Sequence, residues 1–245
     1  MTETTKIIQE HRSIRKYKEK PIDDEIMKDL FLSAQSASSS HNVQAYSIIF
    51  IKDQEKKDMI SNLAGDQLWV RTCPVFLVFC ADLFKLKTAC EMNDAPYALN
   101  GIENLIVGIV DTALVAQTLL ISAESYGLGG VFIGGIRNNS SKVSELLNLP
   151  EYVIPIAGMC LGYPDDNPGK KPRQPMDIVV HEDSYQIEKI VPGLLDYDEV
   201  ISDYYSKRTN GEKTQGWTEL MAEYLASERR LDLKEFIIGK GIKII

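Results

Sequence analysis

The sequence lacks the motifs that identify the commonest nucleotide-binding and hydrolytic enzymes. It contains neither GxGxxG nor GxxxxGK followed by Ser or Thr, so the ordinary dinucleotide and P-loop signatures are absent. It also has no HExxH and no GxSxG motif, and it has only three histidines. Metal-dependent hydrolysis and triad chemistry are therefore disfavoured. We predict no metal site and interpret His181 as a structural histidine.

Cysteine is scarce and shows no ligand-like spacing. None of the four cysteines lies in a CxxC or zinc-site arrangement, and Cys80 and Cys160 lie inside apolar runs. No disulfide framework is indicated, so we expect a reducing compartment, the cytoplasm. Cys90 lies in a polar region, and the pattern does not define its role.

Positive charge is in the minority, because 27 Lys and Arg residues face 35 Asp and Glu residues. The net charge of -8 argues against nucleic-acid binding, which needs a basic surface, but it leaves room for a local anion site. The first residues have no basic stretch followed by an apolar core, so no secretory signal is expected. The longest apolar run, 105–121, contains Asp111 and Gln117, which favours a buried helix over a membrane span.

Periodicity divides the 245 residues into alternating helices and strands, which predicts an α+β or α/β fold with one sheet sandwiched by helices. Apolar residues at helical spacing predict helices at 4–10, 23–34, 54–63, 102–126 and 140–147. Apolar and β-branched runs predict strands at 45–51, 74–81, 131–133 and 156–161. Ser140 or Ser141 is the expected cap of the last of these helices, and Pro150 and Pro155 are expected to bracket a loop. Residues 82–94 give no clear pattern.

The chain changes character after Tyr163. Residues 165–175 form a stretch rich in Pro, Gly and Lys, which predicts a loop. Charged helices are expected at 197–207, 217–230 and 234–245. This tail could form an excursion over a site or over a partner subunit.

Four polar segments remain as candidates for a site. His11–Arg15 offers two guanidinium groups, an imidazole and a hydroxyl, which suit an anion. Ser38–Gln44 offers hydroxyl and amide groups that can read the edge of a flat heterocycle. Phe132–Gly135 ends in glycines that let a ligand approach the backbone. Lys170–Arg173 is a second basic cluster. Taken alone, each segment also has an ordinary structural interpretation. The first two could be loops, the third a strand end and the fourth a patch of surface charge.

Taken in order, the runs HRSIRKY, SSSHNVQAYSII, GLGGVFIGGIRNN and GYPDDNPGKKPRQP resemble the FMN-dependent nitroreductase superfamily. More narrowly, they resemble its NADPH-dependent nitroreductase and flavin reductase branch. The similarity covers essentially the whole chain and includes residues 203–208 and Trp217. It implies an α+β nitroreductase-like fold with a central mixed sheet between helices. It also implies an intertwined homodimer with a C-terminal helical excursion and two FMN sites at the subunit interface. Residues 1–163 would form the FMN-binding core, and residues 164–245 an extension with a phosphate loop and the excursion, the whole being one intertwined domain.

The resemblance also assigns cofactor-binding residues. The FMN phosphate would be held by His11, Arg12, Ser13, Lys171 and Arg173. The pyrimidine edge of the ring would be addressed by Arg15, Gln67 and the 38–44 loop, including Ser39, Ser40 and Gln44. The ring near N5 would be lined by Phe132, Ile133, Gly134 and Gly135. No catalytic side chain is obligatory, because the chemistry takes place on the flavin.

Three cations in the tail bear on the choice of pyridine nucleotide. In the family branch, cations at the positions of Lys207, Arg208 and Lys213 meet the NADPH 2′-phosphate, although Lys213 stands where some members have arginine. Basic residues are also favoured at a helix C-terminus by the dipole, and the two interpretations have equal weight. NADPH is therefore the expected donor, with NADH possible. Asn42 replaces an aromatic residue of some relatives, which would change how acceptors stack.

The function that the resemblance implies is an FMN-dependent NADPH oxidoreductase that reduces nitroaromatics, quinones or free flavin by ping-pong hydride transfer. One alternative is a dedicated NAD(P)H:FMN reductase that supplies reduced flavin. A second, of a different class, is a flavin-binding or storage protein without significant turnover. Small-molecule acceptors and a second copy of the chain are the expected partners, with neither nucleic acid nor membrane. The physiological acceptor is not specified by the sequence.

Overall fold

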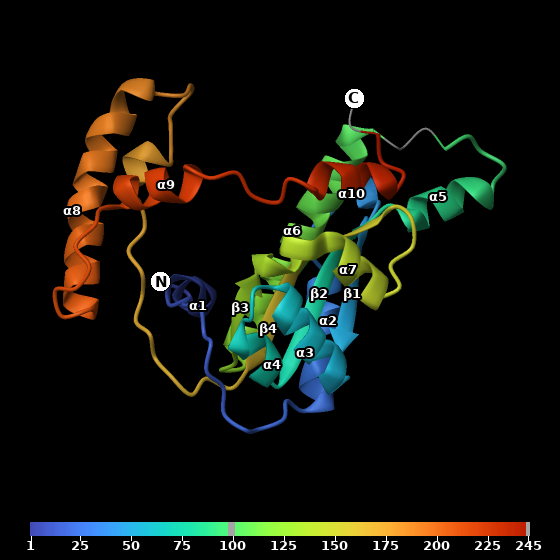
Figure 1. Ribbon diagram of the computed structural model, residues 1–245, viewed down its shortest axis with the longest axis horizontal. Coiled ribbons are helices and arrows are strands. Elements are labelled where there is room, and N and C mark those ends of the chain that lie inside the picture. The colour runs from blue at the N-terminus through green and yellow to red at the C-terminus, as the bar shows by residue number, and fades with distance from the viewer. Residues whose placement is uncertain (98–100, 244–245) are drawn as a thin grey trace. The chain divides into compact units, whose positions relative to one another are not determined.

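The structure is a computed structural model that describes residues 1–97 and 101–243, so the last two residues of the predicted 234–245 helix lie outside it. The chain divides into two compact units (Figure 1). Unit 1 consists of residues 1–168 and 230–245, and unit 2 consists of residues 169–229. Each unit is described by itself below.

The core of unit 1 is a four-stranded sheet with the order β1-β2-β4-β3. Its strands are β1 (Tyr46–Ile51), β2 (Val75–Asp82), β3 (Gly129–Ile133) and β4 (Val153–Gly162). Every pairing among them is antiparallel. The α+β fold class is confirmed, but the mixed sheet was wrong for the strands that the structure describes. Pairing direction depends on how the connections return the chain to the sheet, which residue patterns do not encode.

One of the two prolines expected to bracket a loop lies inside a strand. Pro155 pairs with Cys80 and Ala157 pairs with Phe79, so Ile156 is an extra residue at a shift of register. A bulge tolerates proline because the ladder hydrogen bond that proline cannot donate is already interrupted there. Strand β4 therefore starts before the predicted boundary at residue 156.

Helices cover both faces of this sheet, as the uninterrupted apolar run of β2 predicted. Leu77 and Phe79 point into a cluster with residues of α2 (Asp24–Gln35) and α6 (Ile102–Ser125). Phe76 and Val78 point into a second cluster with residues of α3 (Gln54–Leu63), α4 (Leu68–Thr72) and α7 (Ser140–Leu146). All eight residues of β2 are buried, which explains why its sequence shows no polar alternation.

The predicted helices of unit 1 are confirmed in position, with corrections at their ends. Asp23 caps α2 by accepting from the backbone N–H of Glu25 (3.0 Å). Asn139, and neither Ser140 nor Ser141, caps α7 by accepting from the N–H of Lys142 (3.2 Å). The pattern missed α4 and α5 (Phe84–Glu91), which are short and weakly periodic. The remaining helices of this unit are α1 (Glu3–Gln9) and α10 (Leu233–Gly239).

Helix α6 has two apolar faces. One face packs on the sheet through residues such as Leu119, which is fully buried. The other face exposes five large apolar side chains, namely Ile102, Ile106, Ile109, Val110 and Leu114. Helix α6 is long and apolar enough to cross a membrane, but the core helices of soluble proteins meet the same criterion. Asp111 of this helix is buried inside unit 1.

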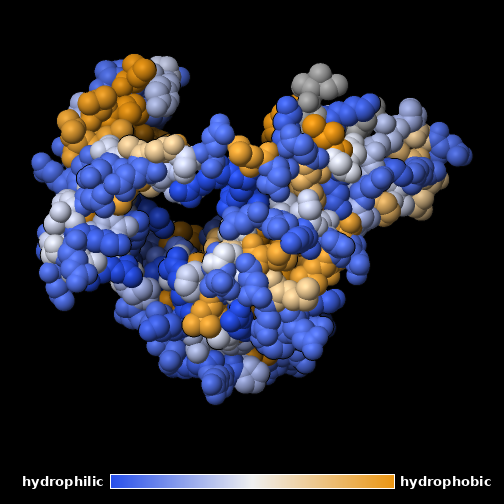
Figure 2. All heavy atoms as spheres, viewed as in Figure 1, coloured by the Kyte–Doolittle hydropathy of each residue, from blue (hydrophilic) through white to orange (hydrophobic). Residues whose placement is uncertain are grey.

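Unit 2 is built from α8 (Ile190–Arg208) and α9 (Trp217–Leu225), preceded by the short 3₁₀ helices η3 (Met176–Ile178) and η4 (Ile187–Lys189). The rings of Tyr197 and Trp217 join the two long helices, with centroids 6.1 Å apart. Helix α9 ends at Leu225, short of the predicted boundary at Arg230. Figure 2 shows apolar side chains on the surface of α8, which include Val191 and Leu195.

Candidate functional site

The segment from His11 to Arg15 is held at its centre by Ile14. The Ile14 backbone N–H donates to the Gly130 carbonyl in β3 (3.0 Å), and the Ile14 side chain is buried. A Cβ at Gly129 would lie 2.5 Å from Cγ1 of Ile14, so glycine there lets Ile14 pack directly on β3. The Tyr17 hydroxyl donates to the Ile14 carbonyl (2.6 Å), and burial raises the pKa of Tyr17, which keeps it a donor. The polar residues on either side of Ile14 are thereby fixed in place.

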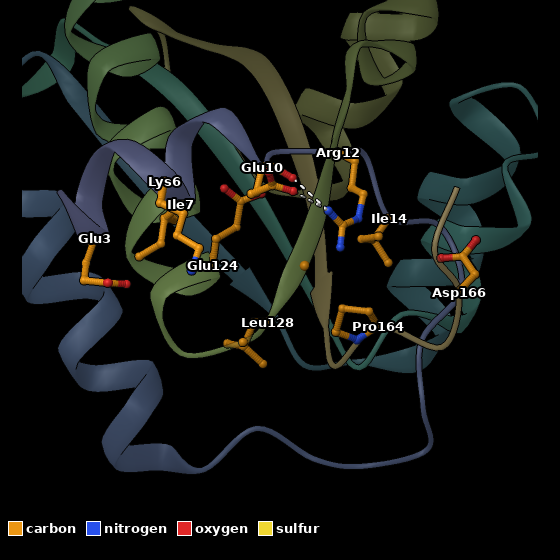
Figure 3. Close-up of a pocket in the computed structure, with 12 residues that line it drawn as sticks. Glu3, Lys6, Ile7, Glu10, Arg12, Ile14, Glu124, Leu128, Pro164 and Asp166 are labelled. Carbon is orange, nitrogen blue, oxygen red and sulfur yellow. Dashed lines mark hydrogen bonds and ion pairs between the residues drawn. The ribbon is translucent and has the colours of Figure 1, made fainter. Parts of the chain in front are cut away.

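The predicted phosphate-binding side chains of this segment have partners within the chain. His11 Nδ1 lies 2.6 Å from Oε1 of Glu124, which belongs to the last turn of α6. Arg12 donates to the Glu10 carbonyl (3.0 Å) and lies 3.7 Å from the Glu10 carboxylate. Ser13 is half-buried between them and Ile14. Arg12 and Glu124 also line a cavity of about 300 Å³ beside α1 (Figure 3).

Arg15 belongs to a second set of contacts that leads to the glycine pair after β3. Its guanidinium carbon lies 5.6 Å from the centre of the Trp69 ring. Trp69 Nε1 donates to Gln67 Oε1 (3.0 Å), and Gln67 Nε2 donates to the Ala64 carbonyl (2.8 Å). A Cβ at Gly135 would lie 2.4 Å from that carbonyl oxygen and 2.5 Å from Gln67 Nε2. Three predicted ring-binding residues, Arg15, Gln67 and Gly135, are therefore connected through Trp69 and Ala64.

Gly134 differs from Gly135 although the two are neighbours in the 3₁₀ helix η2 (Gly134–Asn139). A Cβ at Gly134 would meet its nearest atom, Nη2 of Arg137, at 3.5 Å, which is ordinary van der Waals distance. The Gly134 carbonyl accepts from Nη2 of Arg230 (3.1 Å), and the same guanidinium donates to Asn138 Oδ1. The backbone at Gly134 is thus held at its carbonyl, and a side chain at its Cα would be in van der Waals contact with the Arg137 guanidinium. Beside it, Ile133 is buried and Phe132 is 38% exposed.

Residues 39–44 (the 39–44 loop), which lie within the predicted 38–44 loop, are anchored by a buried carboxylate on α6. Asp111 is fully buried, and its two oxygens accept from the backbone N–H groups of Ser40 (3.0 Å) and Ala45 (3.1 Å). Between these anchors the loop adopts positive φ angles at three non-glycine residues, namely His41, Asn42 and Gln44. Their side chains are exposed, as is Ser40, whereas Ser39 is half-buried. A strained backbone fixed at both ends presents polar groups in a defined direction.

The basic loop residues belong to unit 2. Lys171 Nζ donates to the Tyr205 hydroxyl (2.8 Å) and lies 5.1 Å from the centre of the Tyr205 ring. Arg173 is exposed, and Pro172 between them accepts a hydrogen bond from the Tyr197 hydroxyl (2.9 Å). The loop is therefore attached to α8. That these residues bind the same phosphate as the His11–Arg15 segment stays a prediction.

The three tail cations lie together at the C-terminal end of α8. Lys207 pairs with Asp203 (2.6 Å), and Arg208 donates to the Tyr204 hydroxyl (2.6 Å). The Lys213 backbone N–H donates to Thr209 Oγ1 (2.9 Å), which folds the following turn back onto the helix. Both interpretations of these cations, a 2′-phosphate site and a helix-end preference, are compatible with this placement.

Four residues that support the site were not predicted as site residues from the sequence. Trp69, Glu124 and Arg230 belong to no motif and contact Arg15, His11 and Gly134, respectively, which lie far from them along the chain. Asp111 gave a usable signal, because a carboxylate inside an otherwise apolar helix must find buried donors. That the unit 1 residues bind an anion at His11–Ser13, hydrogen-bond a heterocycle at Arg15 and Gln67, and admit a flat ring at Gly134 stays a prediction.

Comparison with known proteins finds matches to one protein family over most of the chain. Residues 8–163 match the model of the nitroreductase family, and residues 171–244 match that of its C-terminal domain. The chain is 39% identical to an FMN reductase (NAD(P)H) of Bacillus subtilis, covering 100% of this chain and 99% of that protein. It is 41% identical to an oxygen-insensitive NADPH nitroreductase of Salmonella typhimurium, covering 98% of each. The solved structure of B. megaterium NfrA2 superposes with a TM-score of 0.97 at 40% identity, covering 100% of both chains.

Proposed function

The chain belongs to the nitroreductase family, and on that premise we propose that it is an FMN-dependent oxidoreductase that uses NADPH to reduce nitroaromatic compounds, quinones or free flavin. The relatives named FMN reductase and NADPH nitroreductase, which match over nearly the whole chain, support this class of activity. The observation that carries the proposal is the glycine pair. A Cβ at Gly135 would collide with Ala64 and Gln67, whereas a Cβ at the half-buried Gly134 would meet only the Arg137 guanidinium, at 3.5 Å or more. Gly134 is therefore the glycine of the pair at which we propose that a flat ring approaches the backbone.

The donor set of the chain suits FMN. His11, Arg12 and Ser13 offer cationic and hydroxyl donors to a phosphate, with Lys171 and Arg173 proposed as further phosphate ligands. Arg15 and Gln67 would meet the pyrimidine edge, together with Ser39, Ser40 and Gln44 of the 39–44 loop. Phe132, Ile133, Gly134 and Gly135 would line the ring. Because the Gly134 carbonyl is held by Arg230, the peptide that would face the ring has a fixed orientation.

The protein's part in the reaction is to orient the cofactor and to supply charge. The residues named above would hold FMN, and the chemistry supplied by the bound flavin would be hydride transfer from the donor to the acceptor. The Arg15 guanidinium, held over Trp69, would supply positive charge where negative charge develops on the reduced flavin. One pocket over the free face of the ring would be used in turn by donor and acceptor, which predicts ping-pong kinetics. Asn42 is exposed in the 39–44 loop, where it would face the acceptor without an aromatic wall.

The proposal also names the donor, the assembly and the compartment. NADPH would be chosen over NADH through Lys207, Arg208 and Lys213 at the end of α8. A homodimer would cover the exposed apolar face of α6, because five large apolar side chains on one helix face favour a protein partner. The free state of the four cysteines supports a reducing compartment, the cytoplasm.

The experiment that tests this function is an absorbance spectrum of the purified full-length protein followed by anaerobic addition of NADPH. We expect flavin bands that NADPH bleaches and that a nitroaromatic compound or a quinone restores. A dedicated flavin reductase would instead oxidise NADPH rapidly only when free FMN is supplied. Flavin bands that neither NADPH nor NADH bleaches would indicate a binding protein. A colourless protein that takes up no added FMN would refute the assignment.

A further inference from the structure

Glu124 is an unusual residue for its place in α6. It lies in the last turn of the helix, where the backbone carbonyls already carry partial negative charge and a carboxylate is disfavoured. Its side chain is only 12% exposed, and its Oε2 atom is buried with no hydrogen-bond partner in the part of the chain that the structure describes. A carboxylate in this position needs a cationic partner.

That partner is His11, the first residue of the basic segment. The 2.6 Å contact joins Nδ1 of the imidazole to Oε1 of Glu124 across 113 positions of sequence. The backbone of the segment is fixed three residues later, where the Ile14 N–H donates to Gly130. With the backbone tied at Ile14 and Nδ1 occupied by Glu124, Nε2 is the ring atom left to meet a ligand.

The surroundings make this orientation matter for an anion. The cavity beside α1 that Glu124 lines contains four carboxylates and two cations, namely Glu3, Glu10, Glu124, Asp166, Lys6 and Arg12 (Figure 3). Of the two cations, Arg12 already forms an ion pair with Glu10 (3.7 Å). A phosphate bound at the adjacent His11–Ser13 segment would lie beside these carboxylates, and a donor presented by the imidazole would offset their repulsion. An imidazole that donates from both nitrogens is the cation, and the Glu124 carboxylate complements that charge.

We propose that Glu124 is a positioning residue for the phosphate end of the flavin, and that it acts by holding the His11 imidazole through Nδ1 so that Nε2–H is presented to the phosphate. This inference rests on the proposed function, because it takes FMN as the ligand. Glu124 itself does not touch the cofactor. Its effect is therefore confined to ligands that carry the phosphate.

Riboflavin provides the discriminating probe, because it has the same ring as FMN and lacks the phosphate. The dissociation constants of FMN and of riboflavin are measured by flavin fluorescence on the deflavinated full-length protein and on its Glu124→Ala and Glu124→Gln variants. We expect Glu124→Ala to weaken FMN by about tenfold, the loss of one charge-assisted hydrogen bond, and to leave riboflavin within about twofold. Glu124→Gln keeps an oxygen that can accept from Nδ1 and should recover most of the FMN affinity.

A double-mutant cycle with His11→Ala identifies the route of the effect. If Glu124 acts through the imidazole, Glu124→Ala adds no further loss of FMN affinity in the His11→Ala background. Ring ¹⁵N NMR of the flavin-free protein, with His11→Ala used for assignment among the three histidines, should show Nδ1 of His11 protonated and hydrogen-bonded in the wild type and altered in Glu124→Ala.

Four results would overturn the inference alone. Equal weakening of FMN and riboflavin would mean that Glu124 supports the fold rather than the phosphate site. Unchanged FMN affinity in Glu124→Ala, or a full loss that persists in the His11→Ala background, would show that Glu124 does not act through the His11 imidazole. A wild-type protein that binds riboflavin and FMN equally would refute this inference while leaving a flavin enzyme possible. A wild-type protein that binds neither would refute the proposed function as well.

Discussion

Replacing Asp111 with alanine should destabilise the protein strongly and release the 39–44 loop. The side chain is fully buried and accepts from the N–H groups of Ser40 and Ala45. Alanine leaves the buried N–H of Ala45 without a partner, which costs about 1–3 kcal/mol, and the part-buried N–H of Ser40 without one at a smaller cost. We therefore expect a loss of about 2–4 kcal/mol in the free energy of unfolding, a large part of the ~5–15 kcal/mol typical of a folded protein. Asp111→Asn should lose about half as much, because an amide offers a single acceptor oxygen.

Urea denaturation followed by circular dichroism measures this loss as a lower midpoint at unchanged slope. The matched control is Gln117→Ala, an exposed position on the same helix, for which a change within about 0.5 kcal/mol is expected. Amide hydrogen exchange adds the local measurement, since the N–H groups of Ser40 and Ala45 should lose protection in Asp111→Ala. A variant whose midpoint matches that of Gln117→Ala, with both amides still protected, would show that the carboxylate does not hold the loop.

Three further predictions follow from other contacts. Gly135→Ala should abolish flavin binding or folding, because its Cβ would lie 2.4 Å from a backbone oxygen, whereas Gly134→Ala should fold normally; equal melting temperatures of the two variants would contradict this. Arg208→Ala should raise KM for NADPH by about tenfold, one phosphate contact, and leave KM for NADH unchanged; a helix-end role alone would leave both constants unchanged in steady-state assays. Partial burial acts to raise the pKa of Asp198, but hydrogen bonds from Thr218 outweigh it and the pKa is lowered. Because the folded pKa lies below the unfolded value, the stability that Asp198 contributes is present above about pH 4 and is lost as the pH falls through the folded pKa. Urea midpoints of the wild type and Asp198→Asn should therefore differ at neutral pH and converge in acid.

Sequence patterns identified most elements because local burial determines them. The apolar run at β2 and the helical spacing at α3 gave elements within one residue of their observed bounds. Short elements such as α4 and α5 contain too few turns for a period to be visible. The antiparallel direction of the sheet and the bulge at Pro155 depend on contacts between distant segments. Information of that kind is not contained in a window of sequence.

The candidate site shows the same division. Motifs located the residues that would touch a ligand, such as His11, Arg15 and Gly134, since these residue types suit an anion or a flat ring. The residues that orient them were missed, because Glu124 and Arg230 are separated from their partners by 113 and 96 positions. A motif lists ligand-facing groups, whereas their geometry is set by side chains that the fold brings from elsewhere.

Helix α6 explains why two of these supporting residues occur on one element. Asp111 fixes the 39–44 loop and Glu124 holds His11, and their separation of 13 positions corresponds to about 20 Å of a stiff helix. The buried face of α6 packs on the sheet, so Asp111 and Glu124 are both fixed relative to the same rigid core. The opposite face exposes its apolar side chains. A subunit partner on that face would therefore contact the element that positions both the loop and the basic segment. Dimer formation and flavin affinity should consequently depend on the same helix, although none of the exposed side chains need touch the flavin.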